Sequence, residues 1–551
     1  MTINRRQTLG LFGSGAALAL PTVALAQGAP AIRFDHGVAS GDPAADGAVL
    51  WTRATSIDPA ATGDIALTWH IATSEDGKPI ASGKATARAS RDFTAKIVAT
   101  GLKAGTEHWF WFEGKDGTRS PKGRFRTLPV GATADLRFAV VSCQLYGGGL
   151  FNVYDAIAKQ PRLDAVLHLG DYIYEYGADG YGADIARRID RIVEPAHEIV
   201  TLADYRARHA QVKRDANMQA AHARAAFICV WDDHEVANDG WIGGAENHDP
   251  ATEGDWKARK VAAMQAYFEW MPIRDPLPGK PWEAINRSFE FGDLMTLAMV
   301  ETRLLARSEQ VAAKGAGVAP ADYAPMMAQR ARPDRELLGA GQQAWLEGVL
   351  AASVKAGKPW QVLGNQVVMA RVAGPDIERQ LGAARFADIL AKLPTMWRDR
   401  LSASIASYRA GLPFNFDSWD GYPPARERLY QAFRRAGSQP IVLSGDSHAA
   451  WANVLRDDAR TPVAVEFGAT AVTSPSYGSL LPGIGKLIAQ ANEEVLFCDQ
   501  DSKGYVLLTL DREGATADFR AVSTVLVPAY DERSVARYRC SAGAKAALVA
   551  I

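Results

Sequence analysis

Several stretches of this chain place side chains that can bind metal ions directly after an apolar run. The clearest run spans residues 163–169 and is followed by Gly170 and Asp171, with Tyr174 three residues later. A carboxylate and a phenol at one strand end are hard oxygen donors that suit a highly charged cation. Taken alone, the stretch is equally well explained as a strand-to-loop turn with an ordinary acidic cap.

The same order of an apolar run followed by metal-ligand residue types recurs along the chain. The other runs are 136–141, 226–231 and 440–444. Open α/β sheets build their sites at the carboxyl ends of strands, so these ends together predict one shared polynuclear metal site. The residues at these ends, with Asn238 a little further on, are Cys143, Asp232, Asp233, His234, Asp446 and His448.

The elements that must position these residues fall into two regions. Residues 31–130 contain short alternating apolar runs separated by Gly, Asp and Pro, which is typical of an immunoglobulin- or fibronectin-like β-sandwich. Residues 136–528 alternate apolar strands with helical stretches and form the predicted catalytic domain. Residues 529–551 are polar and then Ala-rich, which leaves a helix that caps the site mouth or a frayed end as alternatives.

Residues 1–26 are typical of a targeting segment. Arg5 and Arg6 precede an apolar, Gly- and Ala-rich stretch, and small residues at 24–26 suit a cleavage site. The paired arginines favour the twin-arginine export machinery as a partner, although Thr8 stands where a bulky apolar residue is usual. An ordinary secretory signal is the alternative. In both cases the protein is expected to be periplasmic or secreted.

The composition is that of a soluble globular protein, with 48% hydrophobic and 22% charged residues. A formal net charge of −1 gives no basic field for nucleic acid. No later apolar run approaches the roughly 18 residues of a transmembrane segment. The 4 cysteines are too few for a disulfide scaffold, which leaves only the pairing of Cys498 with Cys540 open.

The order of these motifs resembles that of the calcineurin-like metallophosphoesterases. Three departures make it similar to the alkaline phosphatase D (PhoD) family in particular: Cys143 replaces the usual first Asp, Asp233 replaces an Asn, and Asp446 replaces a His. The resemblance implies an α+β fold, with a four-layer α/β/β/α metallophosphoesterase domain preceded by the N-terminal sandwich. It covers nearly all of the chain after the targeting segment, through further motifs at 37–43, 50–53, 301–303, 338–346, 364–366 and 417–423.

The ligand types indicate which metals the site would bind. Two histidines are few for a zinc or copper site, whereas a thiolate and a phenolate favour iron(III), and carboxylate and amide oxygens suit calcium. The resemblance implies the same combination, Fe3+ with Ca2+, the calcium in two sites. The expected assignment has Asp171 as the shared bridging ligand, Cys143 and Tyr174 on iron, Asp446 and His448 completing the cluster, Asp233 and Asn238 on the calcium side, and Asp232 as the alternate ligand.

Two further residues are candidates for the chemical step. His234 occupies the place from which related enzymes contact phosphate or protonate the leaving oxygen, so it is the candidate general acid. Arg303 follows the apolar stretch 297–300 and could clamp phosphate through its bidentate fork, with a structural ion pair as the alternative.

These observations predict an exported, metal-dependent phosphoric ester hydrolase that acts on phosphate mono- or diesters through an activated hydroxide. A phospholipase D-type phosphodiesterase is the first alternative. Two other classes remain open: a hydrolase with Cys143 as nucleophile beside His448 and an Asp, and a non-catalytic, calcium-stabilised binding protein.

Overall fold

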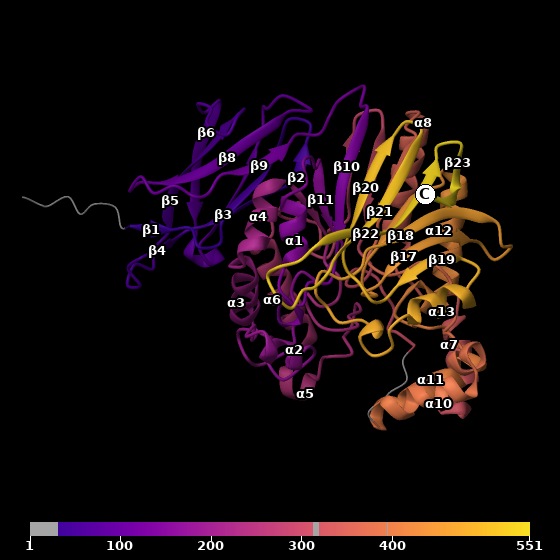
Figure 1. The fold of residues 1–551 in the computed structure, drawn as a ribbon. Coiled ribbons are helices and arrows are strands. Elements are labelled where there is room, and N and C mark those ends of the chain that lie inside the picture. The colour runs from indigo at the N-terminus through magenta and orange to yellow at the C-terminus, as the bar shows by residue number, and fades with distance from the viewer. Residues whose placement is uncertain (1–30, 312–318, 394) are drawn as a thin grey trace, which may run out of the picture.

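The computed structural model describes residues 31–311, 319–393 and 395–551 (Figure 1). The targeting segment predicted for residues 1–26 lies outside the described residues. Within them, no helix is both long and apolar enough to cross a membrane.

The largest sheet of the described residues has ten strands, and its centre is parallel. Neighbouring strands β10, β11 and β12 are the apolar runs that the sequence analysis placed before the ligand residues, and they pair in parallel. Their carboxyl ends therefore meet at one edge of the sheet. In spatial order the strands are β23 (Ala544–Ala550), β22 (Glu532–Ser541), β21 (Gly514–Val522), β20 (Lys503–Asp511), β10 (Asp135–Val141), β11 (Ala165–His168), β12 (Phe227–Cys229), β2 (Val38–Ala44), β3 (Gly47–Arg53) and β7 (Thr94–Ala99).

A second sheet, of seven strands in the described residues, packs against the first one face to face. Aromatic pairs join the two sheets: Phe138 meets Phe291 at 5.1 Å and Phe497 meets Phe519 at 5.3 Å between ring centroids. The apolar side chains between the sheets form the main core. In spatial order the strands are β13 (Arg287–Phe291), β14 (Met295–Met299), β15 (Trp360–Gly364), β16 (Ile441–Ser444), β18 (Pro462–Gly468), β17 (Ala450–Arg456) and β19 (Val495–Asp499).

Helices cover the outer face of each sheet. On the ten-stranded sheet, α1 (Asn152–Ala158) and α4 (Ala216–Arg224) contact its strands and each other, with α3 (Leu202–Lys213) and α6 (Trp256–Trp270) beside them. On the seven-stranded sheet lie α8 (Gly339–Lys355), α12 (Pro423–Arg435) and α13 (Ile484–Ala491). This arrangement is the predicted four-layer α/β/β/α domain.

The N-terminal region also consists of two packed sheets, but one of them is not confined to it. A separate four-stranded sheet, in the order β6 (Ala81–Ala87), β5 (Ile65–Ala72), β8 (Glu107–Gly114) and β9 (Gly123–Arg126), covers β2, β3 and β7 through a common apolar core. Strand β2 pairs in parallel with β12 of the catalytic domain, Gly41 opposite Phe227. The sandwich is therefore continuous with the sheet that carries the site (Figure 1).

The C-terminal tail differs from the predicted capping helix. Residues 529–551 contain strands β22 and β23, which pair antiparallel and extend the ten-stranded sheet beyond β21. Residues 536–541 alternate small or apolar side chains with polar ones, which suits a strand with one covered face, and β22 pairs with β21 along its length. Cys498 and Cys540 do not pair: both thiols are free and buried, as are Cys143 and Cys229.

Candidate metal centre

The candidate ligands meet where the carboxyl ends of strands from both sheets converge. Cys143 follows β10, Asp171 follows β11 and Asp233 follows β12, all from the ten-stranded sheet. Asp446 and His448 follow β16 of the seven-stranded sheet. Because the sheets pack face to face, these loops enclose one space from two sides.

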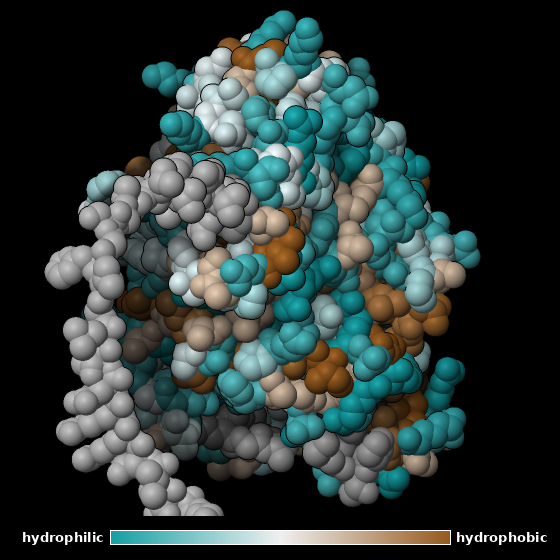
Figure 2. Space-filling view, turned by 90° about the vertical axis from the view of Figure 1, so that its left-hand side faces the viewer, coloured by the Kyte–Doolittle hydropathy of each residue, from teal (hydrophilic) through white to brown (hydrophobic). Residues whose placement is uncertain are grey.

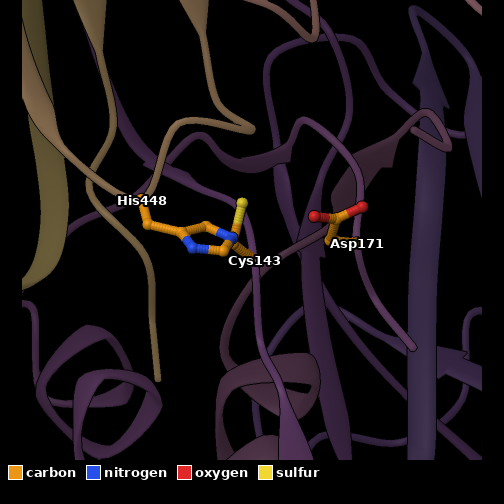
Figure 3. Close-up of side chains that lie close together, drawn as sticks. All are labelled: Cys143, Asp171 and His448. Atoms are coloured by element: carbon orange, nitrogen blue, oxygen red, sulfur yellow. The ribbon is translucent and has the colours of Figure 1, made fainter. Parts of the chain in front are cut away.

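The first group of converging donors is Cys143, Asp171 and His448. One ligand atom from each, the thiol sulfur, a carboxylate oxygen and an imidazole nitrogen, lies within 4.8 Å of the others. Figure 3 shows the thiol and the imidazole pointing into the same space, which the carboxylate of Asp171 faces from the other side. Cys143 and Asp171 are buried, so the structure brings together three ligands that are far apart in sequence.

The phenol of Tyr174 lies at this group as well. Its hydroxyl donates to Oδ2 of Asp171 at 3.0 Å and lies 3.3 Å from Nε2 of His448. Ser474, which the sequence analysis did not single out, donates to the Tyr174 hydroxyl at 2.7 Å. Tyr174 therefore has the position expected of an additional oxygen ligand.

Asp171 also belongs to a second group, with Asp233 and His234. A third group joins Asp233 with Asp232 and Asp446. Shared membership makes the groups one continuous cluster, in which Asp171 and Asp233 are the links. This geometry is consistent with a bridging position for Asp171.

A fourth group contains two carboxylates that the sequence analysis did not assign, Asp239 and Asp417, together with Asp233. The backbone N–H of Asp239 donates to Oδ2 of Asp233 at 2.7 Å. The predicted ligand beside it, Asn238, instead turns its amide to Oε2 of Glu246 at 3.1 Å. In the sequence, Asp239 was signalled by its place beside Asn238 and Asp417 by its place at the start of the motif at 417–423, but neither was assigned as a ligand.

Arg303 lies fully buried among these carboxylates. Its guanidinium donates to Asp232, to both carboxylate oxygens of Asp417 at 2.8 and 2.7 Å, and to Oδ1 of Asp446 at 2.9 Å. The carboxylates raise the pKa of Arg303 well above its ordinary value despite its burial. The ion-pair alternative for Arg303 is thus present in this structure.

His234 is held by a carboxylate that the sequence analysis did not assign. Its Nδ1 donates to Oε2 of Glu175 at 2.7 Å, and the other oxygen of Glu175 accepts the backbone N–H of Asn238 at 2.8 Å. Burial alone would lower the pKa of His234, but Glu175, Asp233 and Asp171 together raise it well above its ordinary value. These carboxylates therefore favour the protonated form of the imidazole, and Nε2 is the ring nitrogen that Glu175 does not occupy.

Glu235 holds two strand ends at a fixed separation. Its carboxylate accepts the backbone N–H groups of Asp171 at 3.1 Å, Tyr172 at 2.6 Å and Asp232 at 2.8 Å. Gly170 makes this approach possible, because a Cβ there would lie 2.3 Å from Cβ of Asp232. The loops after β11 and β12 are thereby locked together.

Several ligands have unusual backbone conformations. Cys143, Asp171, Asp446 and His448 have φ values of 61°, 58°, 59° and 56°. For a residue other than glycine this left-handed region costs roughly 1–2 kcal/mol, and such strain clusters at functional sites. Its recurrence at four ligands from both sheets supports a site that the fold maintains at the expense of stability.

The cluster concentrates negative charge that the described residues do not fully compensate. Oδ1 of Asp171 and Oδ2 of Asp232 are buried without a hydrogen-bond partner. Burial and the neighbouring carboxylates raise the pKa of Asp171 well above its ordinary value, and burial raises that of Asp446 to about 7. Bound cations would remove this penalty.

A cavity of about 660 Å³ gives access to the cluster. Asp446 and His448 line it on the side of the metal centre. Tyr181, whose hydroxyl lies 3.3 Å from Nδ1 of His448, and Arg187 of α2 (Ala183–Arg188) also line it. This volume is in the range of small-molecule sites, so a small substrate can reach the cluster.

Comparisons with known proteins identify the family. The model of the "PhoD-like phosphatase" family matches residues 138–519, and that of the "PhoD-like phosphatase, N-terminal domain" matches residues 20–129. This chain belongs to the PhoD-like phosphatase family. It is 34% identical over 510 residues to "Alkaline phosphatase D" of Bacillus subtilis (strain 168), covering 90% of this chain and 78% of that protein.

The fold of this PhoD-like phosphatase agrees with the family assignment. A solved structure described as "Structure of PhoD" superposes with a TM-score of 0.77 at 30% sequence identity, covering 94% of this chain and 92% of that one. The predicted resemblance and the predicted fold class are thus confirmed, and the chain is a phosphatase.

Proposed function

We propose that this protein is an exported phosphoric ester hydrolase whose cluster holds iron and calcium. The observation that carries the proposal is the convergence of Cys143, Asp171, Asp233 and His448, with Tyr174, in one continuous cluster beside an accessible cavity. Membership of the PhoD-like phosphatases supports phosphoester chemistry there.

The donor set fits the proposed ions. Cys143, Tyr174 and His448 surround one position with sulfur, phenol oxygen and nitrogen, and Asp171 faces it, which suits iron(III). On the other side of Asp171 the donors are carboxylates, including Asp233, which suits calcium. The partnerless oxygens of Asp171 and Asp232 are ready to bind cations. Bound there, the ions would supply positive charge to phosphoryl oxygens and lower the pKa of a water molecule.

His234 is the proposed general acid. Glu175 fixes its orientation and raises its pKa, so that the proton on Nε2 is available to a departing ester oxygen. The ring of Tyr174 packs against the imidazole with centroids 4.2 Å apart and restricts its rotation. The proton donor is therefore preorganised at the edge of the cluster.

Arg303 is proposed to position carboxylates. Its three side-chain nitrogens donate to Asp232, Asp417 and Asp446 in this structure, and its side chain is fully buried. A direct phosphate clamp, the role expected from the sequence, would require some of these bonds to be exchanged for bonds to substrate.

The cysteine-nucleophile alternative is disfavoured by the surroundings of Cys143. A nucleophilic cysteine needs a lowered pKa, but burial and the carboxylate of Asp171 raise the pKa of this thiol well above its ordinary value. Among the described residues its side chain has one hydrogen-bond partner, the hydroxyl of Ser142 at 3.2 Å. A phospholipase D-type activity would use the same cluster and stays an alternative within the proposed chemistry.

Elemental analysis of the purified protein beside an activity screen tests the proposal. We expect iron with about two equivalents of calcium, and hydrolysis of p-nitrophenyl phosphate, bis(p-nitrophenyl) phosphate or both. Chelation should abolish turnover, whereas a thiol-alkylating reagent should not affect the loaded enzyme. Activity that survives complete metal removal would contradict the proposal. Fractionation of the producing cells tests export separately: the mature protein should appear outside the cytoplasm, shortened by a segment near residues 1–26.

A further inference from the structure

An apolar groove lies next to the cavity of the metal centre. Its walls come from α9 (Ile377–Leu381), α11 (Thr395–Arg409) and the segment that leads into α13, and its volume is about 110 Å³. In Figure 1, α11 projects below α13 at the lower right. Most of the lining side chains are apolar or aromatic, among them Ile377, Leu401, Tyr408, Phe414, Leu481 and Ile484.

This groove differs from the scattered apolar residues on the face shown in Figure 2. On the face shown in Figure 2, hydrophobic residues form small patches separated by polar ones, which is ordinary for a soluble protein. The groove is concave and adjoins the active-site cavity. Tyr477 and Leu480 line both spaces and are 53% and 40% exposed, so they form the partition between them.

Phe414 and Asn415 form a second boundary between the groove and the metal-centre cavity. Phe414 lines the groove, and the next residue, Asn415, lines the metal-centre cavity. Phe414 meets the ring of Tyr477 edge-on at 5.6 Å between centroids. Asn415 accepts the backbone N–H of Asp417 at 2.8 Å, which couples this wall to the carboxylate cluster. The position of the groove relative to the cluster is therefore fixed by packing and hydrogen bonding.

We propose that the groove binds an apolar alkyl or aryl group of the phosphoric ester whose phosphoryl group lies at the metal centre. This inference rests on the proposed function and specifies its substrate class. Charged side chains such as Asp179, Arg187 and Asp446 stand in the lining of the metal-centre cavity, whereas most of the groove lining is apolar, so an apolar substituent is better placed in the groove. Its 110 Å³ falls short of the roughly 150 Å³ of an apolar cavity that binds benzene. It therefore suits a short chain or part of one ring, and excludes a complete fatty-acyl chain.

Alkyl phosphates of increasing length test this substrate class on the metal-loaded enzyme. We expect kcat/KM for release of inorganic phosphate to rise about tenfold or more from methyl to butyl phosphate, because each added methylene leaves water for an apolar wall. From butyl to octyl phosphate it should stay level, because the groove is filled. The dissociation constants of methyl-, butyl- and octylphosphonate, measured by calorimetry without any turnover, should fall about tenfold or more from methyl to butyl and then stay level.

Two variants locate the effect in the groove. Ser404→Phe fills it and Leu401→Asn makes it polar, so both should lose the preference for butyl over methyl while hydrolysing methyl phosphate at the original rate. Leu487→Asn is the matched control, since Leu487 packs at the edge of the same core as Leu401 but lines neither space, and it should keep the preference.

The possible results separate the inference from the proposed function. If the wild-type enzyme hydrolyses p-nitrophenyl esters but has the same kcat/KM for methyl, butyl and octyl phosphate, the groove is not a substrate subsite and the proposed function stands. The inference is also overturned if kcat/KM continues to rise from butyl to octyl phosphate, or if the preference for butyl over methyl phosphate persists in Ser404→Phe. If no phosphoric ester is hydrolysed by the loaded protein, the proposed function fails, and equal affinity for the three phosphonates would then reject the groove as well.

Discussion

Nδ1 of His234 lies 2.7 Å from Oε2 of Glu175, and both side chains are buried. The two residues come from different strand ends, His234 after β12 and Glu175 after β11. Their pairing orients one nitrogen of the imidazole away from Glu175 and keeps the ring charged. The proposed proton donor is thus positioned by a residue that sequence spacing alone does not connect to it.

Glu175→Gln should shift the pH dependence of turnover. A general acid works only while protonated, so activity is lost as pH rises through its pKa. Glu175 raises the pKa of His234, and its loss should move the basic limb of the kcat profile to lower pH by about one unit or more. His234→Gln should lower kcat by about 10²–10⁴-fold. An unchanged basic limb in Glu175→Gln would argue against His234 as the acid.

Asp171→Asn should abolish both metal loading and turnover. Asp171 belongs to two of the donor groups, so a neutral amide there weakens both sides of the cluster. We expect kcat/KM to fall by about 10³-fold or more, with loss of bound metal in elemental analysis. Asp179→Asn, at an exposed position on the cavity rim, is the matched control and should keep its metal. Retention of metal and activity in Asp171→Asn would refute the assignment.

Arg303→Met distinguishes two roles for Arg303, positioning of the carboxylates and direct binding of the substrate phosphate. In the metal-free protein it leaves Asp232 and Asp446 without their cation and Asp417 with Arg307 alone, which should cost about 3–5 kcal/mol of unfolding free energy. If Arg303 acts through the carboxylates, metal affinity should fall while KM of the reloaded enzyme changes little. A large rise in KM at full metal loading would instead show a phosphate clamp. Denaturant titration and steady-state kinetics provide the two measurements.

Metal removal should make stability depend on pH. Burial raises the pKa of Asp446 to about 7 and that of Glu235 to about 8, above unfolded values near 4. The folded, metal-free protein therefore holds protons that the unfolded chain has released. Its free energy of unfolding falls as pH rises from about 4 through 8, by up to about 1.4 kcal/mol per pH unit for each of the two carboxyl groups. Calorimetry with and without chelator should show a loss in Tm that is larger at pH 8 than at pH 5. An equal loss at both values would contradict this account.

Removal of residues 31–130 should prevent soluble folding of the catalytic domain. Strand β2 pairs with β12, and Ala226 of the catalytic domain is part of the core between the N-terminal sheets. Truncation would expose that apolar surface and an unpaired strand edge, a template for aggregation. Expression of a chain that begins near Asp135 should yield insoluble protein. A soluble truncated domain with normal metal content would show that the two regions fold independently.

The sequence by itself determined the local elements and most of the ligand types. Apolar runs are strands because they fill the space between two layers, and the residues that follow Val141, His168, Cys229 and Ser444 reach the carboxyl ends that build the site. Cys143, Asp171, Tyr174 and His448 could be selected on that basis, and the structure brings them together.

Only the tertiary structure decided which side chains complete the cluster. Asp417 joins it through the packing of a distant loop, Arg303 turns to three carboxylates, and Asn238 turns away to Glu246. The C-terminal tail forms strands because β21 offers a free edge. The positions of Asp417 and Arg303 depend on contacts between residues more than 70 positions apart in the chain, which local propensity and spacing do not encode.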